Sequence, residues 1–234
     1  MEAFRVETPL GPIELLGRDT GAPVQLVITG AFASSNTLEL NQQRFPELDV
    51  WRTHLPGNHS PPLVATSVGV FAAAISHALR QRLAGRTASV IGLSVGALVA
   101  MALDPALVGR LLLVEPPLRP DRAWPLAQLL DAMPPGGEDF VWQVFGLAEW
   151  RAEPRDYTGL VERLRRPAKV VLGGDALLPE RERTGWPSLV DADSRRRLAA
   201  HPGIEVEVLA GAGHHVLKEA WPQFEPIMRA FAAG

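Results

Sequence analysis

A serine between two glycines stands where a predicted strand gives way to a predicted helix. The pentapeptide Gly92-Leu93-Ser94-Val95-Gly96 follows the apolar run 88–91 and precedes the helical pattern 97–103. Glycines on both sides allow the sharp strand-to-helix turn that exposes a serine hydroxyl at a helix N-terminus. This context predicts that Ser94 is a nucleophile. The plainer alternative is that Ser94 only caps the helix.

A nucleophilic serine needs a base to take its proton, and histidine is the usual one. His214 and His215 follow the last predicted strand in a glycine-rich loop, 211–215, that could reach Ser94 at the carboxyl edge of a sheet. Of the two neighbours we expect His214 to be the base. The remaining histidines are predicted to be structural or surface residues: His54, His59, His77 and His201.

The base must in turn be oriented by a carboxylate at the end of an intervening strand. Asp175 follows the predicted strand 169–172 on a glycine-rich turn and lies between Ser94 and His214 in the chain. We therefore expect Asp175 to be this acid. Glu115, directly after the strand that ends at Val114, is the alternative.

Negative charge on a substrate carbonyl oxygen must be stabilised by fixed donors, usually backbone N–H groups. The N–H of Val95, next after the nucleophile, is one expected donor. The second should come from the loop 29–32, with Ala31 favoured and Phe32 possible. Such a site needs neither a metal nor a cofactor, and the absence of cysteine excludes thiolate zinc sites and iron–sulfur clusters.

Strand-like and helix-like segments alternate along most of the chain. Nearly continuous apolar runs such as 24–28 and 111–114 are typical of strands covered on both faces, which favours an α/β fold with a mostly parallel sheet. The predicted strands are 4–8, 13–16, 24–29, 48–55, 88–92, 110–114, 169–172 and 205–209. The predicted helices are 67–83, 94–103, 192–200, 221–233 and a short one over 36–44.

Residues 116–167 interrupt this alternation with many prolines and short apolar pieces. We interpret them as a cap of short helices inserted into a single domain that spans 1–234. Four aromatic residues are expected to line a substrate pocket: Phe32, Trp124, Trp142 and Phe145. The alternative is that the aromatic residues of the insertion only pack it onto the domain. Arginines also gather there, and acidic residues among them favour a mixed, solvated face over an anion-binding rim.

Composition removes several classes of protein. The 234 residues are 47% hydrophobic and 21% charged with a net charge of −3, which fits neither a disordered chain nor a nucleic-acid binder. No apolar run is long enough to cross a membrane, and the N-terminus does not resemble a secretory signal. We expect a cytoplasmic protein that acts on a small molecule, with no membrane or nucleic-acid partner. The oligomeric state stays open.

With these residues assembled, the chain resembles the serine α/β-hydrolases over essentially its whole length. The nucleophile turn 92–96, the acid turn 174–179 and the histidine loop 211–214 match the family pattern in order, and 55–60 is similar to its Pro-Gly turn. The resemblance implies an eight-stranded, mostly parallel sheet flanked by helices, with one antiparallel strand near the start and a helical cap after the sixth strand. Thr29 stands where the family has histidine.

The expected function is hydrolysis of a carboxylic ester of a small or medium apolar acyl or aromatic substrate. A Ser94-His214-Asp175 triad would act through an acyl-enzyme. Thioester hydrolysis, hydrolytic C–C cleavage and acyl transfer use the same triad and stay open. Because of Thr29, a non-catalytic ligand-binding homologue is a further alternative.

Overall fold

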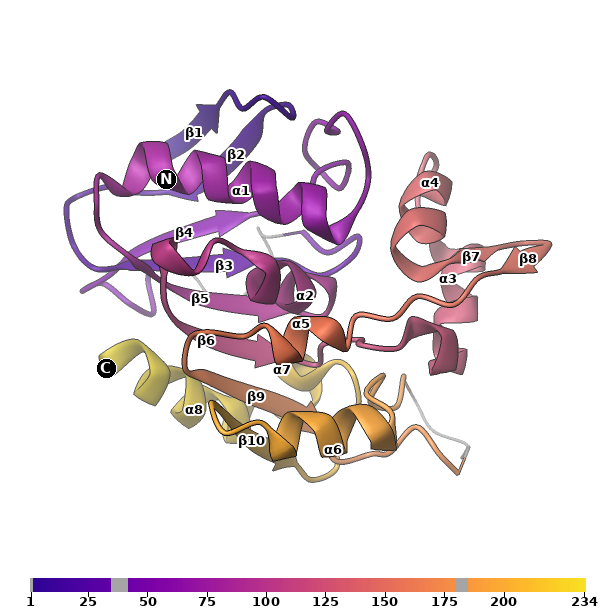
Figure 1. Cartoon of the computed structure of the whole chain (residues 1–234). Coiled ribbons are helices and arrows are strands. Elements are labelled where there is room, and N and C mark those ends of the chain that lie inside the picture. The colour runs from indigo at the N-terminus through magenta and orange to yellow at the C-terminus, as the bar shows by residue number, and fades with distance from the viewer. Residues whose placement is uncertain (1, 35–41, 180–184) are drawn as a thin grey trace.

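Apolar runs in the sequence form the strands of one eight-stranded sheet (Figure 1). The computed structural model describes residues 2–34, 42–179 and 185–234. Every strand expected from the sequence is present within a few residues of its predicted ends. The strands are β1 (Glu2–Val6), β2 (Ile13–Gly17), β3 (Val24–Ile28), β4 (Asp49–Thr53), β5 (Ala88–Leu93), β6 (Val108–Val114), β9 (Ala168–Gly173) and β10 (Ile204–Leu209).

The sheet is mostly parallel, as predicted. Its order is β1-β2-β4-β3-β5-β6-β9-β10, and β2 runs antiparallel to both β1 and β4. The other neighbouring pairs are parallel. The carboxyl ends of β3, β5, β6 and β9 therefore meet at one edge, where loops can bring side chains from distant parts of the chain together.

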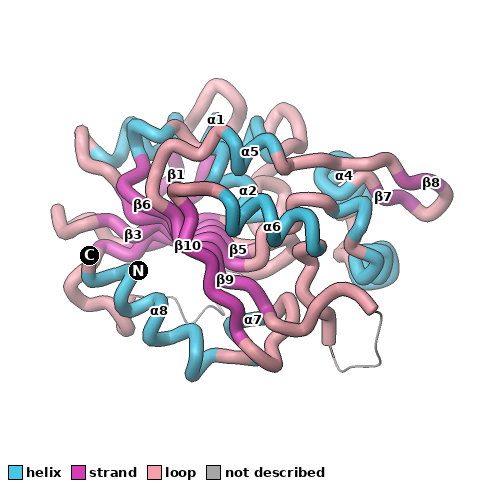
Figure 2. Tube along the Cα trace, turned by 60° about the horizontal axis from the view of Figure 1, so that its bottom comes forward, coloured by secondary structure: helices cyan, strands magenta, loops and turns pink. Residues whose placement is uncertain are grey.

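Helices cover both faces of the sheet, which is why the central strands are apolar on both sides. Figure 2 shows α1, α2 and α6 on one side and α8 on the other. On the α8 side, the buried Phe224 and Met228 pack in a core with Ile91 and Leu112 of the sheet. The helices are α1 (Val68–Leu83), α2 (Val95–Ala102), α6 (Ala192–Ala200), α7 (Val216–Glu219) and α8 (Trp221–Ala233), with a short 3₁₀ turn over Pro105–Leu107.

Sequence signals fix several helix ends. The hydroxyl of Ser67 accepts a hydrogen bond from the N–H of Val70 at 3.1 Å, so Ser67 caps α1 as its residue type suggests. α6 and α8 have the bounds expected from the pattern. Of the short helix predicted over 36–44, residues 36–41 lie outside the described part of the chain, and 42–44 form a turn.

Between β6 and β9 the chain forms many short elements in place of long ones. Besides the expected short helices there is a hairpin, β7 (Leu147–Ala148) with β8 (Arg151–Ala152), whose two-residue strands are too short to leave a pattern in the sequence. The helical pieces are Pro120–Arg122, Trp124–Gln128, α3 (Leu129–Ala132), α4 (Glu138–Phe140), Val141–Phe145 and α5 (Gly159–Glu162). In Figure 1, α3, α4, β7 and β8 lie beyond the arrowheads of β5 and β6, and α5 lies beside α2.

The described helices include none that combines the length and the hydropathy needed to cross a bilayer.

Candidate active site

Ser94 stands on a strained turn between β5 and α2. Its φ of 53° lies in the left-handed region that a non-glycine residue seldom adopts, and such strain concentrates at functional sites. Its hydroxyl makes no capping hydrogen bond to α2, so the reading of Ser94 as a mere helix cap is not supported. The turn requires glycine at position 96, because a Cβ there would lie 2.4 Å from the carbonyl oxygen of Ile28.

A backbone hydrogen bond ties this turn to the neighbouring strand. The N–H of Ser94 donates to the carbonyl of Val114, the last residue of β6, at 2.8 Å. On the other side, Gly30, the second residue after β3, lies so close to Ser94 that a Cβ on Gly30 would be 3.2 Å from the Cβ of Ser94. Ser94 is therefore held at the carboxyl ends of β3, β5 and β6.

His214 meets a buried carboxylate at the same edge. Its Nδ1 lies 3.2 Å from Oε2 of Glu115, a residue that is 1% exposed and directly follows β6. A carboxylate can only accept, so this hydrogen bond requires the proton on Nδ1. Nε2 of the neutral ring is then left as the acceptor, which is the form a general base needs.

The Glu115 carboxylate is held by donors from two further loops. Oε1 accepts from the N–H of Gly173 at 2.7 Å and from Oγ of Ser188 at 2.8 Å. Oε2 also accepts from the N–H of Leu189 at 3.0 Å. Three fixed donors together with His214 thus satisfy the oxygens of this carboxylate away from water.

Arg195 adds a positive charge near this carboxylate. Burial lowers the pKa of the Arg195 guanidinium, and the charge of Glu115 acts in the opposite direction. Its Nη2 donates to the carbonyl of Gly173 at 2.6 Å, so α6 is joined to the end of β9.

The pairing of His214 with Glu115 differs from the prediction that Asp175 orients the imidazole. Asp175 lies on the turn after β9, where its N–H donates to Ala212 at 2.9 Å and its carbonyl accepts from Ser188 at 2.9 Å. β6 and β9 are adjacent, so an acid after either strand stands at the same edge. Glu115 comes directly after β6, and its carboxylate is the one that bonds His214. Asp175 comes two residues after the end of β9.

The expected oxyanion donors lie around Ser94. Val95 is the first residue of α2, so its N–H has no acceptor within the helix. Ala31 is half-buried and lines the same cavity as Ser94. Thr29, in place of the family histidine, is fully buried, and its N–H donates to Thr53 at 3.2 Å.

Ser94, Glu115 and His214 line one cavity of about 390 Å³. Most of the rest of its wall is apolar, and it includes Phe145, which was predicted from the sequence to line it. The other described lining residues are Gly30, Ala31, Ala33, Leu93, Val114, Leu126, Leu129, Trp186, Leu189, His215, Val216, Leu217 and Lys218. A pocket of this size with few polar groups suits a small or medium organic molecule.

Three aromatic residues expected in this pocket are not among the described residues that line it. The ring of Phe32 packs against Phe140 at 5.3 Å between centroids, and its φ of 55° turns the loop after Ala31. Trp124 donates from its indole to the carbonyl of Leu177 at 3.3 Å. Trp142 lies under the guanidinium of Arg151, 3.6 Å from the ring centroid. Aromatic content therefore did not reveal which side chains of the insertion face Ser94.

Trp186 lines the cavity beside His214, although no pattern in the sequence singled it out. The two ring centroids are 6.1 Å apart, and the carbonyl of Trp186 accepts from the N–H of His214 at 3.1 Å. The indole N–H donates to Oε1 of Gln128 from the inserted segment at 2.8 Å. The only available signal was a tryptophan next to Pro187 in a loop before α6.

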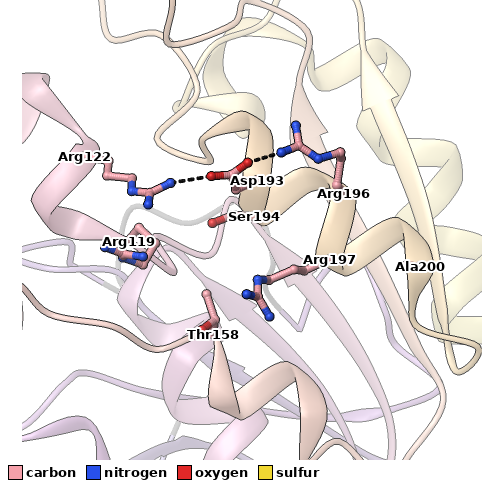
Figure 3. A pocket seen from close by; sticks show the side chains of 8 residues that line it. All are labelled: Arg119, Arg122, Thr158, Asp193, Ser194, Arg196, Arg197 and Ala200. Atoms are coloured by element: carbon pink, nitrogen blue, oxygen red, sulfur yellow. Dashed lines mark hydrogen bonds and ion pairs between the residues drawn. The ribbon is translucent and has the colours of Figure 1, made fainter.

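The arginines of the insertion do not form a rim around Ser94. Arg119 and Arg122 line a separate hollow of about 540 Å³ together with Arg196 and Arg197 of α6 (Figure 3). Carboxylates pair with all four of these arginines, as the predicted mixed face requires. The ion pairs are Arg119 with Asp121 and Asp156, Arg122 with Asp191 and Asp193, Arg196 with Asp193, and Arg197 with Glu162.

A metal site is not evident in the part of the chain that the structure describes. Within 2–34, 42–179 and 185–234, no three histidine, aspartate or glutamate side chains are arranged to hold a metal ion.

Comparisons with known proteins agree with this fold. No curated protein matches the sequence. Solved structures similar in fold include a thermophilic esterase from Thermogutta terrifontis, with 16% identity, TM-score 0.72 and coverage of 99% of this chain and 98% of that one. Carboxylesterase CesB from Bacillus subtilis has 19% identity, TM-score 0.70 and coverage of 98% and 90%. The N-acyl homoserine lactonase AidH has 16% identity, TM-score 0.68 and coverage of 98% and 95%.

At these identities the solved structures establish only the shared fold. The assignment to a family rests on the match of the sequence to a family model. The model of the alpha/beta hydrolase family matches residues 26–227, which include the turn of Ser94, the end of β6 and the loop of His214. This chain belongs to the alpha/beta hydrolase family.

Proposed function

We propose that this protein is a serine hydrolase that cleaves carboxylic esters with Ser94 as nucleophile, His214 as base and Glu115 as the acid that orients the base. One observation carries the proposal: the strained serine and the histidine line the same cavity, and the histidine is bonded to a buried carboxylate. The esterase, carboxylesterase and lactonase among the similar folds support ester bonds as the target.

In the proposed mechanism, Nε2 of His214 takes the proton of the Ser94 hydroxyl as Oγ attacks the ester carbonyl carbon. The N–H groups of Val95 and Ala31 hold the carbonyl oxygen as it becomes negative. His214 then gives its proton to the leaving alcohol, and an acyl-enzyme on Ser94 remains. Water, activated by the same histidine, releases the acid and restores the serine.

Glu115 stabilises the imidazolium that forms during both half-reactions. Its charge is fixed by Gly173, Ser188 and Leu189 before any substrate binds, so no reorganisation is needed when the proton moves. Asp175 was the acid expected from the sequence. In this proposal its role is structural, because its backbone hydrogen bonds join the turn after β9 to Ala212 and Ser188.

The inserted segment 116–167 acts as a cap that closes the acyl site. Leu126, Leu129 and Phe145 come from this segment and line the cavity opposite the strand ends. Their apolar side chains favour small or medium acyl groups, because burying such groups removes apolar surface from water.

The test is intact-mass detection of a fluorophosphonate adduct with mapping of the labelled peptide. We expect one adduct per chain on Ser94, and none after Ser94→Ala. His214→Ala should slow labelling at least about 10³-fold, because the serine loses its base.

His215→Ala is the matched control, because this neighbour lies 5.4 Å from the ring of His214 but does not bond Glu115. Labelling should persist in this variant. Folded wild-type protein that takes up neither a large nor a small phosphonate would refute an activated serine, and the ligand-binding alternative would then be preferred.

A further inference from the structure

A single lysine stands at the cavity of Ser94 in a chain that otherwise relies on arginine. Lys169 and Lys218 are the only lysines in the sequence. Lys169 bridges two carboxylates on the neighbouring strand, with Nζ at 2.9 Å from both Glu205 and Glu207. Lys218 has no ion pair within the described residues, and it lines the cavity.

The backbone of Lys218 is fixed although its side chain is exposed. It belongs to α7, the single turn after the histidine loop, and its N–H donates to the carbonyl of His215 at 2.9 Å. Val216, 1% exposed, anchors this turn in the core. The side chain of Lys218 is therefore carried on a fixed turn beside the cavity.

The adjacent acid does not neutralise this cation at the cavity. Oε2 of Glu219 accepts from the N–H of Gly213 at 2.6 Å, so its carboxylate is turned toward the loop. Among the described residues that line the cavity, Lys218 is the only lysine or arginine, and Glu115 is engaged with His214. Within the described residues, Lys218 thus supplies the positive charge at the edge of a largely apolar pocket.

We propose that the substrate of this site is an ester that carries a carboxylate remote from the scissile bond, and that Lys218 binds that carboxylate. This inference rests on the proposed esterase function and names its substrate class. The ester and its apolar chain would occupy the pocket between Ser94 and Phe145, with the charged end at the mouth. A cation beside low-dielectric walls attracts such an anion from solution and orients it.

The test compares matched esters that differ in one terminal group. Monoethyl glutarate and ethyl valerate differ by a carboxylate in place of a methyl group, and release of ethanol reports both. The acetate ester of 4-hydroxybutyrate, compared with butyl acetate, places the charge on the alcohol side. Wild-type protein should prefer the charged member of at least one pair in kcat/KM.

Lys218→Met should lower that preference about fivefold, the upper range for a partly solvated ion pair. The loss should appear in KM for the charged ester with little change in kcat, because a remote contact binds ground state and transition state alike. Lys218→Glu should lower the preference further, and Lys218→Arg should restore most of it. Added salt should weaken the wild-type preference.

Lys169→Met is the matched control, because it removes the same charge from a lysine that does not line the cavity. The inference is overturned if wild type shows no preference, or if Lys218→Met and Lys169→Met change the preference equally. Hydrolysis of neutral esters with no preference would refute this inference alone. If no ester is turned over and Ser94 takes no adduct, the proposed function fails. Binding of monoethyl glutarate to Ser94→Ala, with and without Lys218→Met, would then decide the role of Lys218.

Discussion

The strand ends and the inserted segment 116–167 form opposite walls of one cavity but are built differently. Ser94 and Glu115 directly follow β5 and β6, and both are tied by backbone hydrogen bonds to the next strand, Ser94 to Val114 and Glu115 to Val171. The insertion contributes Leu126 and Phe145 from short helical pieces. The proposed reacting groups thus lie at the ends of sheet strands, and the proposed substrate contacts come from short connecting elements, a kind of segment that tolerates more variation.

Gly96→Ala tests whether the close packing at the strand ends excludes even one added methyl group. A Cβ there would lie 2.4 Å from the carbonyl of Ile28 and 2.5 Å from that of Thr29, and neither backbone atom can move without shifting β3. We expect a loss of about 3 kcal/mol in the free energy of unfolding, together with loss of labelling at Ser94. Chemical denaturation measures the first effect.

Gly159→Ala is the control in the insertion. The nearest atom to a Cβ on Gly159 is Nη2 of Arg163 at 3.9 Å, so the substitution should be neutral or stabilise α5 by up to about 1 kcal/mol. Equal destabilisation by the two alanines would remove the distinction between the regions.

The same division explains what the sequence could predict. Ser94 and His214, the proposed nucleophile and base, could be predicted because a strand, a glycine turn and a helix or loop leave local patterns. The predicted acid was Asp175, whereas His214 bonds Glu115. The two carboxylates follow adjacent strands, and only tertiary packing decides which of them turns toward His214. Donation from Ser188 and Leu189, 73 and 74 residues further on, leaves no trace in the local sequence.

The insertion was predicted less well for a physical reason. Its helical pieces are one or two turns long, so hydrophobic periodicity cannot show which face is inward. Trp142 and Phe145 belong to the same short helix, yet Phe145 lines the cavity and Trp142 stacks on Arg151.

Phe145→Leu and Trp142→Leu compare two residues of that helix, of which Phe145 lines the cavity and Trp142 does not. Phe145 is 1% exposed and forms part of the cavity wall, where we propose that the acyl group binds. A shorter side chain should leave room for a longer acyl group and raise kcat/KM for octanoate relative to butyrate esters about fivefold. Trp142→Leu, outside the cavity, should leave this ratio within about twofold of wild type. A larger shift from Trp142 than from Phe145 would contradict the assignment of the wall.

The smallest expected effect concerns the pH dependence of stability. Burial lowers the pKa of His54 below its ordinary value of 6.5, and the nearby charges of His59 and Arg52 lower it further against the opposing charge of Glu14. The unfolded chain then binds the proton more readily than the folded one. Stability contributed by neutral His54 is complete above pH 6.5 and declines as the pH falls toward the folded pKa.

The decline for one proton is at most about 1.4 kcal/mol per pH unit. His54→Gln should flatten the slope of the free energy of unfolding between pH 6.5 and 5, measured by urea denaturation. A slope that is the same in both proteins would show that His54 titrates alike in the folded and unfolded states.

The most direct test of the central claim is the rate at which fluorophosphonate labels Ser94 in Glu115→Gln and in Asp175→Asn, each first shown to be folded by its melting curve. The account predicts that labelling slows about 10³-fold in Glu115→Gln, because His214 loses the carboxylate that orients it, and stays within about threefold of wild type in Asp175→Asn. Loss of labelling in Asp175→Asn with normal labelling in Glu115→Gln would contradict it.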